Sequence, residues 1–262
     1  MSWLTAAPLW LVALALVGVT TFIAMIGPLI VRKRVSLDEL RTNNEVAGFK
    51  FATVGVIYAV LLGFAVIVVW QKFTDAENDV ALEAGAAATV YRLANGIKGA
   101  QGTAIHEGMS AYLRSAISED WPAMKGGHGS AVVTRALSDL YAALLRYEPT
   151  DPSGTAVFAE VLHQLDLVTQ ARRARLVMAA GIVPGIVWLA LFGGALITIG
   201  FTFFFGTANL RAQSMMTGTL SALILCGLLI IIAIDHPFAG TVKVEPEPLV
   251  AVLADFGNAA KP

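Results

Sequence analysis

Charged and polar side chains border several long apolar stretches of this sequence, where they could attract small ions. The most concentrated are Arg172, Arg173 and Arg175 before one stretch, and Asp235 with His236 after another. Clustered guanidinium groups raise the local concentration of anions. We therefore expect these residues at the mouth or the gate of a conduction path. For Asp235 and His236 a helix cap or an interfacial anchor is the favoured alternative.

Catalytic and metal-binding motifs are absent from the sequence. The histidines lie in four different elements, at His106, His128, His163 and His236, and the only cysteine is Cys226. No zinc-protease, C-x-x-C, Walker or G-x-S-x-G motif occurs, and the glycine-rich segment 126–129 lacks the strand and helix of a phosphate-binding loop. We expect no enzyme activity, no catalytic residue, no cofactor and no metal site.

The elements that position these residues are four uncharged apolar stretches, at 2–31, 51–71, 176–210 and 212–234. Each exceeds the roughly 20 residues that a membrane-spanning helix needs, and only helices satisfy their own backbone polar groups in hydrocarbon. The chain is 14% charged, well below the roughly 25% of a soluble domain, and its net charge of −1 gives no basic face for nucleic acid. The pattern predicts an all-α polytopic membrane protein with four transmembrane helices in the lipid bilayer.

The connecting segments predict four regions and an orientation. We expect two spans with a short basic loop in 1–71, an extramembrane helical domain in 72–175, two further spans in 176–234 and an extended Pro-rich tail in 235–262. Six Lys or Arg lie on the side of loop 32–50 and five near the helix ends on the other side. The positive-inside rule therefore favours a cytoplasmic loop, with the central domain and both termini outside.

The central region reads as a helical bundle built on two membrane helices that continue beyond the lipid. Small and apolar residues recur from Phe73 to Ala94 in steps of three and four, the spacing of a coiled-coil seam. A partner seam runs from Phe158 through Leu165 and Arg172, in a helix that Asp151 should cap and that should continue to the third span. Within that span Pro184 predicts a kink.

Small residues also repeat within the membrane helices, at Gly55, Ala59 and Gly63 in the second and at Gly218, Ala222 and Cys226 in the fourth. Such faces allow helices to approach closely in lipid. We interpret them first as packing within one subunit, and second as an oligomeric contact or a narrow pore wall.

A longer set of residues resembles the bestrophin-like proteins of bacterial membranes. It consists of Val46-Ala47-Gly48, Phe51 through Leu62, Val68-Val69-Trp70, Glu83-Ala84, Tyr91 through Ala94, Trp121-Pro122, Pro184 with Trp188, Asp235, Pro237 through Gly240, and Pro246-Glu247-Pro248. The order is preserved over nearly the whole chain. Near Asn43 and Asn44 the family usually has a His or another polar residue, so the resemblance makes these two asparagines further candidates for the mouth or the gate.

The resemblance implies a homo-oligomeric ion channel of the bacterial inner membrane, a pentamer by analogy, that passes chloride or other small anions. Bestrophin pores are constricted by apolar side chains of the second helix, which makes Tyr58, Leu62, Phe64 and Ile67 the pore-lining candidates. The same resemblance places the central domain in the cytoplasm, opposite to the charge count. Two alternatives stay open: a non-conducting scaffold or sensor that binds a partner through its extramembrane helices, and a carrier of a small neutral solute.

Overall fold

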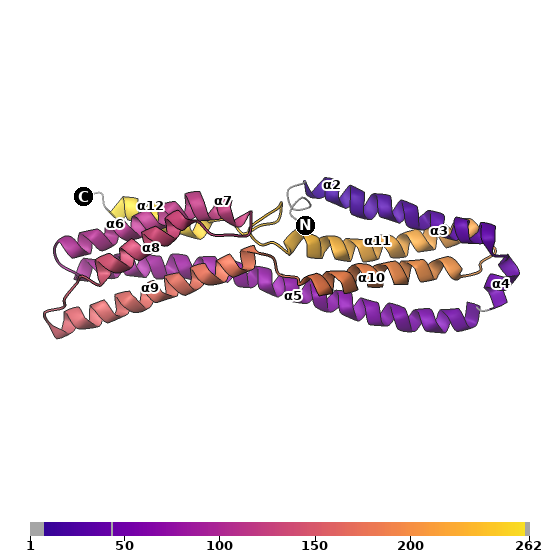
Figure 1. The fold of residues 1–262 in the computed structure, drawn as a ribbon, viewed down its shortest axis with the longest axis horizontal. Coiled ribbons are helices and arrows are strands. Elements are labelled where there is room, and N and C mark those ends of the chain that lie inside the picture. Colours follow the sequence, from indigo (N-terminus) through magenta and orange to yellow (C-terminus); the bar gives the residue numbers. More distant parts are fainter. Residues whose placement is uncertain (1–7, 43, 260–262) are drawn as a thin grey trace. The chain divides into compact units, whose positions relative to one another are not determined.

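The computed structural model describes residues 8–42 and 44–259, and these residues form helices and connecting segments with no strand among them. The chain divides into two compact units (Figure 1). We call Met1–Gln71 together with Ile182–Asp235 the membrane unit, and Lys72–Gly181 together with His236–Pro262 the helical unit.

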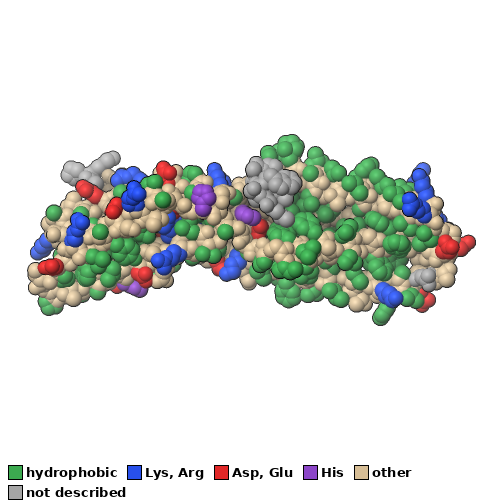
Figure 2. All heavy atoms as spheres, viewed as in Figure 1, with side chains coloured by type: hydrophobic (Ala, Val, Ile, Leu, Met, Phe, Trp, Pro, Cys, Tyr) green, Lys and Arg blue, Asp and Glu red, His purple; other side chains and the backbone are tan. Residues whose placement is uncertain are grey.

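Within the described residues, the membrane unit holds four helices that are long and apolar enough to span a bilayer, which confirms the predicted all-α, four-span fold. Hydrophobic side chains are spread over much of its visible face, and charged side chains gather at one end of it (Figure 2). The spans and their connections are α2 (Leu9–Ala13), the π-helical η1 (Leu14–Val19) and α3 (Thr20–Arg34), then α4 (Leu37–Thr42), α5 (Asn44–Leu93), α10 (Gly185–Phe201) with η4 (Thr202–Phe204), and α11 (Leu210–Ile234).

The last span, α11, is the most enclosed helix of the membrane unit. Half of its most apolar 18-residue stretch is buried, against 17% for α5 and 11% for the first span. It packs along α3 and also contacts α10. Glycines allow these close approaches: a Cβ added at Gly218 would lie 2.7 Å from Met25, and one added at Gly27 would overlap the Phe203 ring.

The helical unit begins with the second half of α5 and has one apolar core. Its other elements are η2 (Ala94–Gly96), α6 (Ala100–Ser115), η3 (Ala116–Asp120), α7 (Trp121–Met124), α8 (Ala131–Leu144), α9 (Pro152–Ala179) and α12 (Glu247–Ala259). The predicted cap of α9 is confirmed, because the Asp151 carboxylate accepts a hydrogen bond of 2.7 Å from the backbone N–H of Gly154.

The third span differs from the prediction, because a complete break replaces the kink at Pro184. Helix α9 ends at Ala179, Gly181 adopts a left-handed φ of +105°, and α10 starts at Gly185 with Pro184 as its N-cap. A proline cannot donate the hydrogen bond that would continue a helix through it, and glycine accepts the left-handed turn without strain. The extension predicted beyond the third span therefore exists as a separate helix.

The seam of α9 is confirmed in part and is wider than expected. Leu165 and Arg172 are buried as predicted, and Phe158 and Leu162 are partly buried against the core, but Val161, Val168 and Arg175 are buried as well.

The expectation of a tail extended throughout is wrong, since the tail contains α12. Pro248 lies in the first turn of this helix, a position that needs no backbone N–H. Its Leu249 and Phe256 are buried, and the Phe256 ring stacks on Tyr91 at 3.7 Å. The apolar contacts offset the preference of the Pro-rich segment for an extended chain.

Candidate functional site

The four pore-lining candidates lie on different sides of α5. Tyr58 is buried, its hydroxyl donates a 3.1 Å hydrogen bond to the backbone oxygen of Leu191, and its ring packs on Gly194 of α10. Leu62 is half-buried. Phe64 and Ile67 are 65% and 53% exposed. Tyr58 therefore joins two helices of the same subunit, and only Phe64 and Ile67 present most of their surface to the outside.

Leu62 also faces inward. A Cβ added at Gly227 of α11 would lie 2.8 Å from its side chain. The side chain therefore packs on a neighbouring span of the same subunit, as that of Tyr58 does.

Phe64 and Ile67 belong to a longer exposed row on α5, which we call the α5 row. Its members follow one another in steps of four and three, and the apolar ones among them are exposed: Ile57, Val60, Phe64 and Ile67, with Gln71 at the end. This spacing places them on one face of a helix. The row carries no charge, and Lys50, also exposed, lies seven residues before its first member.

Among the residues that the structure describes, none packs on the small-residue face of α5. A Cβ added at Gly55 or at Gly63 would meet no atom within 4 Å, and Ala59 is exposed. The first interpretation, packing within one subunit, is therefore wrong for this face. A second helix can approach α5 closely along it.

Asn44 holds the start of α5 against the loop that precedes α11. Its amide donates to the backbone oxygen of Gly206 at 2.7 Å, and its side-chain oxygen accepts from the Gly206 N–H at 2.8 Å. Both hydrogen-bonding atoms of the side chain are thus used by the fold. Asn43 lies outside the residues that the structure describes.

Asp235 caps the break between α9 and α10 from the end of α11. Its carboxylate, in a residue only 5% exposed, accepts hydrogen bonds from the backbone N–H groups of Val183 at 2.7 Å and Ile182 at 3.2 Å. These N–H groups precede α10 and have no helical partner. The cap interpretation is confirmed for Asp235. His236 packs against Gly181, whose added Cβ would lie 3.0 Å from the imidazole Nε2.

The three arginines have different environments. Arg173 is exposed, whereas Arg172 and Arg175 are buried in an ion-pair network within the helical unit. Arg175 donates from Nε and Nη2 to the two oxygens of Glu83 at 2.9 and 3.0 Å. Arg172 donates in the same way to Asp120 at 2.7 and 3.2 Å. Two of the three predicted mouth cations are therefore neutralised inside the fold.

Further contacts complete this network. The Tyr112 hydroxyl donates to Glu83 at 2.6 Å, the N–H of Ser130 donates to Asp120 at 2.7 Å, and the Trp121 ring lies 4.4 Å from the Arg175 guanidinium carbon. Burial, followed by the charge of Glu83, raises the pKa of Tyr112 well above its usual value. Every charge is matched and hydrogen-bonded, as a buried charge requires.

The comparisons with known proteins agree with this architecture. A family model described as the Bestrophin-like domain matches residues 7–249. The structure is similar to crystal structures of a bacterial bestrophin homolog from Klebsiella pneumoniae. One of these, a variant with a leucine-to-threonine mutation, has 14% identity and a TM-score of 0.69, over 92% of this chain and 98% of that one. The structure phased by Zn-SAD has 16% identity to this chain and a TM-score of 0.65. The match covers 90% of this chain and 94% of that one.

Among curated proteins no sequence matches. The structural similarity, at these low identities, shows a shared fold. The family model covers all four spans and nearly the whole helical unit. From the four spans, the preserved fold and this match it follows that the chain belongs to the bestrophin-like family.

Proposed function

We propose that the protein is a homo-oligomeric anion channel whose pore is lined by the α5 row, with Phe64 and Ile67 at its constriction. The observation that carries the proposal is the row itself, a continuous uncharged face of the second span that the subunit leaves uncovered. In a pore on a symmetry axis, the lining side chains must be exposed on each protomer. Tyr58 and Leu62 do not meet this requirement, because both face their own subunit.

The charge distribution along α5 favours anions over cations. No carboxylate interrupts the row from Ile57 to Gln71, and Lys50 precedes it on the same face. A ring of lysines around a pore mouth attracts anions. An apolar constriction then admits ions that shed water easily, since dewetting of such a segment opposes strongly hydrated ions.

The open small-residue face supports the oligomer. Gly55, Ala59 and Gly63 have room for the backbone of a neighbouring helix. A pentamer is the arrangement that the bestrophin family suggests, and chloride is the first permeant ion to test.

The test is the current across a planar bilayer that contains the purified oligomer under an asymmetric chloride gradient. We expect discrete steps whose reversal potential follows chloride. Phe64→Ala and Ile67→Ala should change the unitary conductance, whereas Leu223→Ala, at an exposed residue of another span, α11, should not.

Two other outcomes would contradict the channel. A verified oligomer that stays silent would point to the scaffold or sensor. Saturable uptake of a neutral solute without current would point to the carrier.

For the location we propose the bacterial inner membrane. The charge count places loop 32–50 in the cytoplasm, and the resemblance to bestrophins places the helical unit there. Labelling separates the two: in a Cys226→Ala background, a cysteine at Asp38 or at Lys125 reacts with an impermeant maleimide in intact spheroplasts only when it faces outward. Lys125 and Asp38 are both exposed, and Cys226 is the only native thiol.

A further inference from the structure

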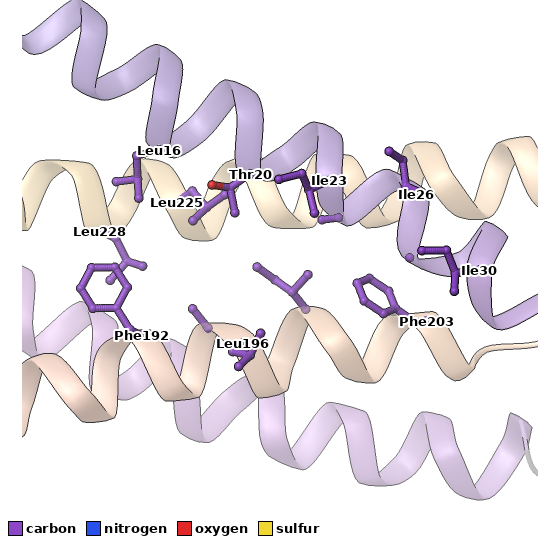
Figure 3. Close-up of a pocket in the computed structure, with 14 residues that line it drawn as sticks. Leu16, Thr20, Ile23, Ile26, Ile30, Phe192, Leu196, Phe203, Leu225 and Leu228 are labelled. Carbon is purple, nitrogen blue, oxygen red and sulfur yellow. The ribbon is translucent and has the colours of Figure 1, made fainter.

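A cavity of about 600 Å³ opens along the first span of the membrane unit (Figure 3). The lining side chains are apolar apart from Thr20, and they come from η1, α3, α10, η4 and α11. They include Leu16, Ile23 and Ile30 on one wall and Phe192, Leu196 and Phe203 on the other. We call this cavity the α3–α10 groove.

The groove has the length of a lipid chain. From Leu16 to Ile30 it follows the first span for 14 residues, which corresponds to about 21 Å at 1.5 Å per residue. One leaflet of the hydrocarbon core is about 15 Å deep. An acyl chain that enters from one membrane surface can therefore lie along the groove for its full extent.

A basic cluster lies at one end of the groove. The last turn of α3 carries Arg32, Lys33 and Arg34. Lys33 and Arg34 follow the groove residue Ile30 by three and four positions, the spacing of neighbours on one helix face, and both are exposed. Arg32 is oriented by its hydrogen bond of 3.3 Å to the backbone oxygen of Thr207.

The surroundings of this cluster remain net positive. Asp38 and Glu39 begin the next helix, α4, and a Glu39 oxygen already accepts from the N–H of Ser36 at 3.0 Å. With Arg41 of the same helix, α3 and α4 together carry four cations against two carboxylates at this end of the groove.

The cluster determines which lipid the groove prefers. Moving an acyl chain from bulk lipid into an apolar groove gives little net gain, because both environments are hydrocarbon. A phosphate head group next to Lys33 and Arg34 adds an electrostatic attraction that a neutral or zwitterionic lipid lacks. We propose that the α3–α10 groove binds one anionic phospholipid per subunit, with an acyl chain along Leu196 and Phe203 and its head group on Lys33 and Arg34.

The experiment is native mass spectrometry of the full chain, released from nanodiscs of equal parts phosphatidylglycerol and phosphatidylcholine. We expect one phosphatidylglycerol retained per subunit. The double variant Lys33→Gln, Arg34→Gln should weaken this retention by on the order of tenfold, as the loss of two cations near a head group implies. Lys72→Gln, Lys125→Gln, which removes two exposed cations outside the groove, is the matched control.

The groove side chains that would contact the acyl chain are tested separately. Leu196→Trp puts a bulky ring on a groove-lining side chain that is 75% exposed, and should displace the lipid. Ile197→Trp changes the neighbouring residue, 62% exposed and outside the groove lining, and should leave it bound. Melting temperatures of all variants show that each is folded.

Two results would overturn the proposal. One is equal retention of both lipids by the parent chain. The other is a change of subunit number in Leu196→Trp with retained lipid unaltered, which would assign the groove to a neighbouring subunit. The measurement needs no current, so it succeeds or fails independently of conduction.

Discussion

Removing one member of the buried ion-pair network should destabilise the protein far more than removing an exposed charge. In Arg175→Met, Glu83 keeps only the Tyr112 hydroxyl among its three hydrogen bonds, and its side chain has no solvent exposure. Breaking a buried pair in this way costs about 3–5 kcal/mol. For a chain of this size the melting temperature should fall by roughly 6–20 °C, at 2–4 °C per kcal/mol.

The double variant Glu83→Leu, Arg175→Met separates the pair from the packing. It leaves no buried charge without its partner at this position, because Asp120 still accepts from Arg172 and from the N–H of Ser130. The double variant should lose less unfolding free energy than the sum of the losses of the two single variants. The difference should be about 0.5–3 kcal/mol, as for other residues in direct contact.

The assay is thermal unfolding of the detergent-solubilised protein, followed by circular dichroism. Lys72 and Asp75 provide the control, since they form an ion pair of similar length, 3.0 Å, with side chains 54% and 52% exposed. Lys72→Met should cost less than about 1 kcal/mol. Equal melting temperatures for Arg175→Met and Lys72→Met, or additive single costs, would refute this account of the network.

Three other predictions concern single side chains. Tyr58→Phe removes the hydrogen bond to Leu191 and should lower the free energy of unfolding by about 1 kcal/mol, while the unitary conductance stays unchanged. An altered conductance would show that Tyr58 lines the pore. Asp235→Asn should lower thermal stability and expression, because a neutral amide caps the two N–H groups less strongly than a carboxylate; normal abundance with altered flux would contradict its role as a cap. Because the pKa of Tyr112 is raised in the fold, its contribution to stability is complete below about pH 10 and is lost as the pH rises toward the higher folded value. Equilibrium unfolding across the alkaline range should show this loss, and Tyr112→Phe should reduce it; an unchanged slope in that variant would exclude Tyr112 as the source.

The sequence was sufficient for the spans, because each is set by length and apolarity alone. It was also sufficient for the α9 cap, where Asp151 and Pro152 form a local signal. The break at Gly181 could not be predicted from the sequence, since a glycine and a proline within one apolar run are also compatible with a kinked span. The break is stabilised by the Asp235 carboxylate, which accepts a hydrogen bond from the N–H of Val183. Asp235 lies at the end of a later helix, so this contact is not visible in the local sequence.

The candidate site was predictable only in part, because exposure depends on partners elsewhere in the chain. Tyr58 and Phe64 lie in the same uncharged stretch, 51–71, of α5, and only the position of α10 makes one of them internal. For Arg172 and Arg175 a usable signal existed. Glu83 falls between Val80 and Ala87 on the buried seam of α5, and a carboxylate there requires a cation nearby.

The central position of α11 has a consequence for biogenesis. The first span packs mainly on α11, yet α3 ends at Arg34 and α11 starts only at Leu210. At 5–20 residues per second, a ribosome needs roughly 10–35 s to bridge that interval. During this time the first span stays in the bilayer without its principal neighbour. A chain truncated before Leu210 should therefore be a substrate for membrane proteases, although three of its spans are already inserted.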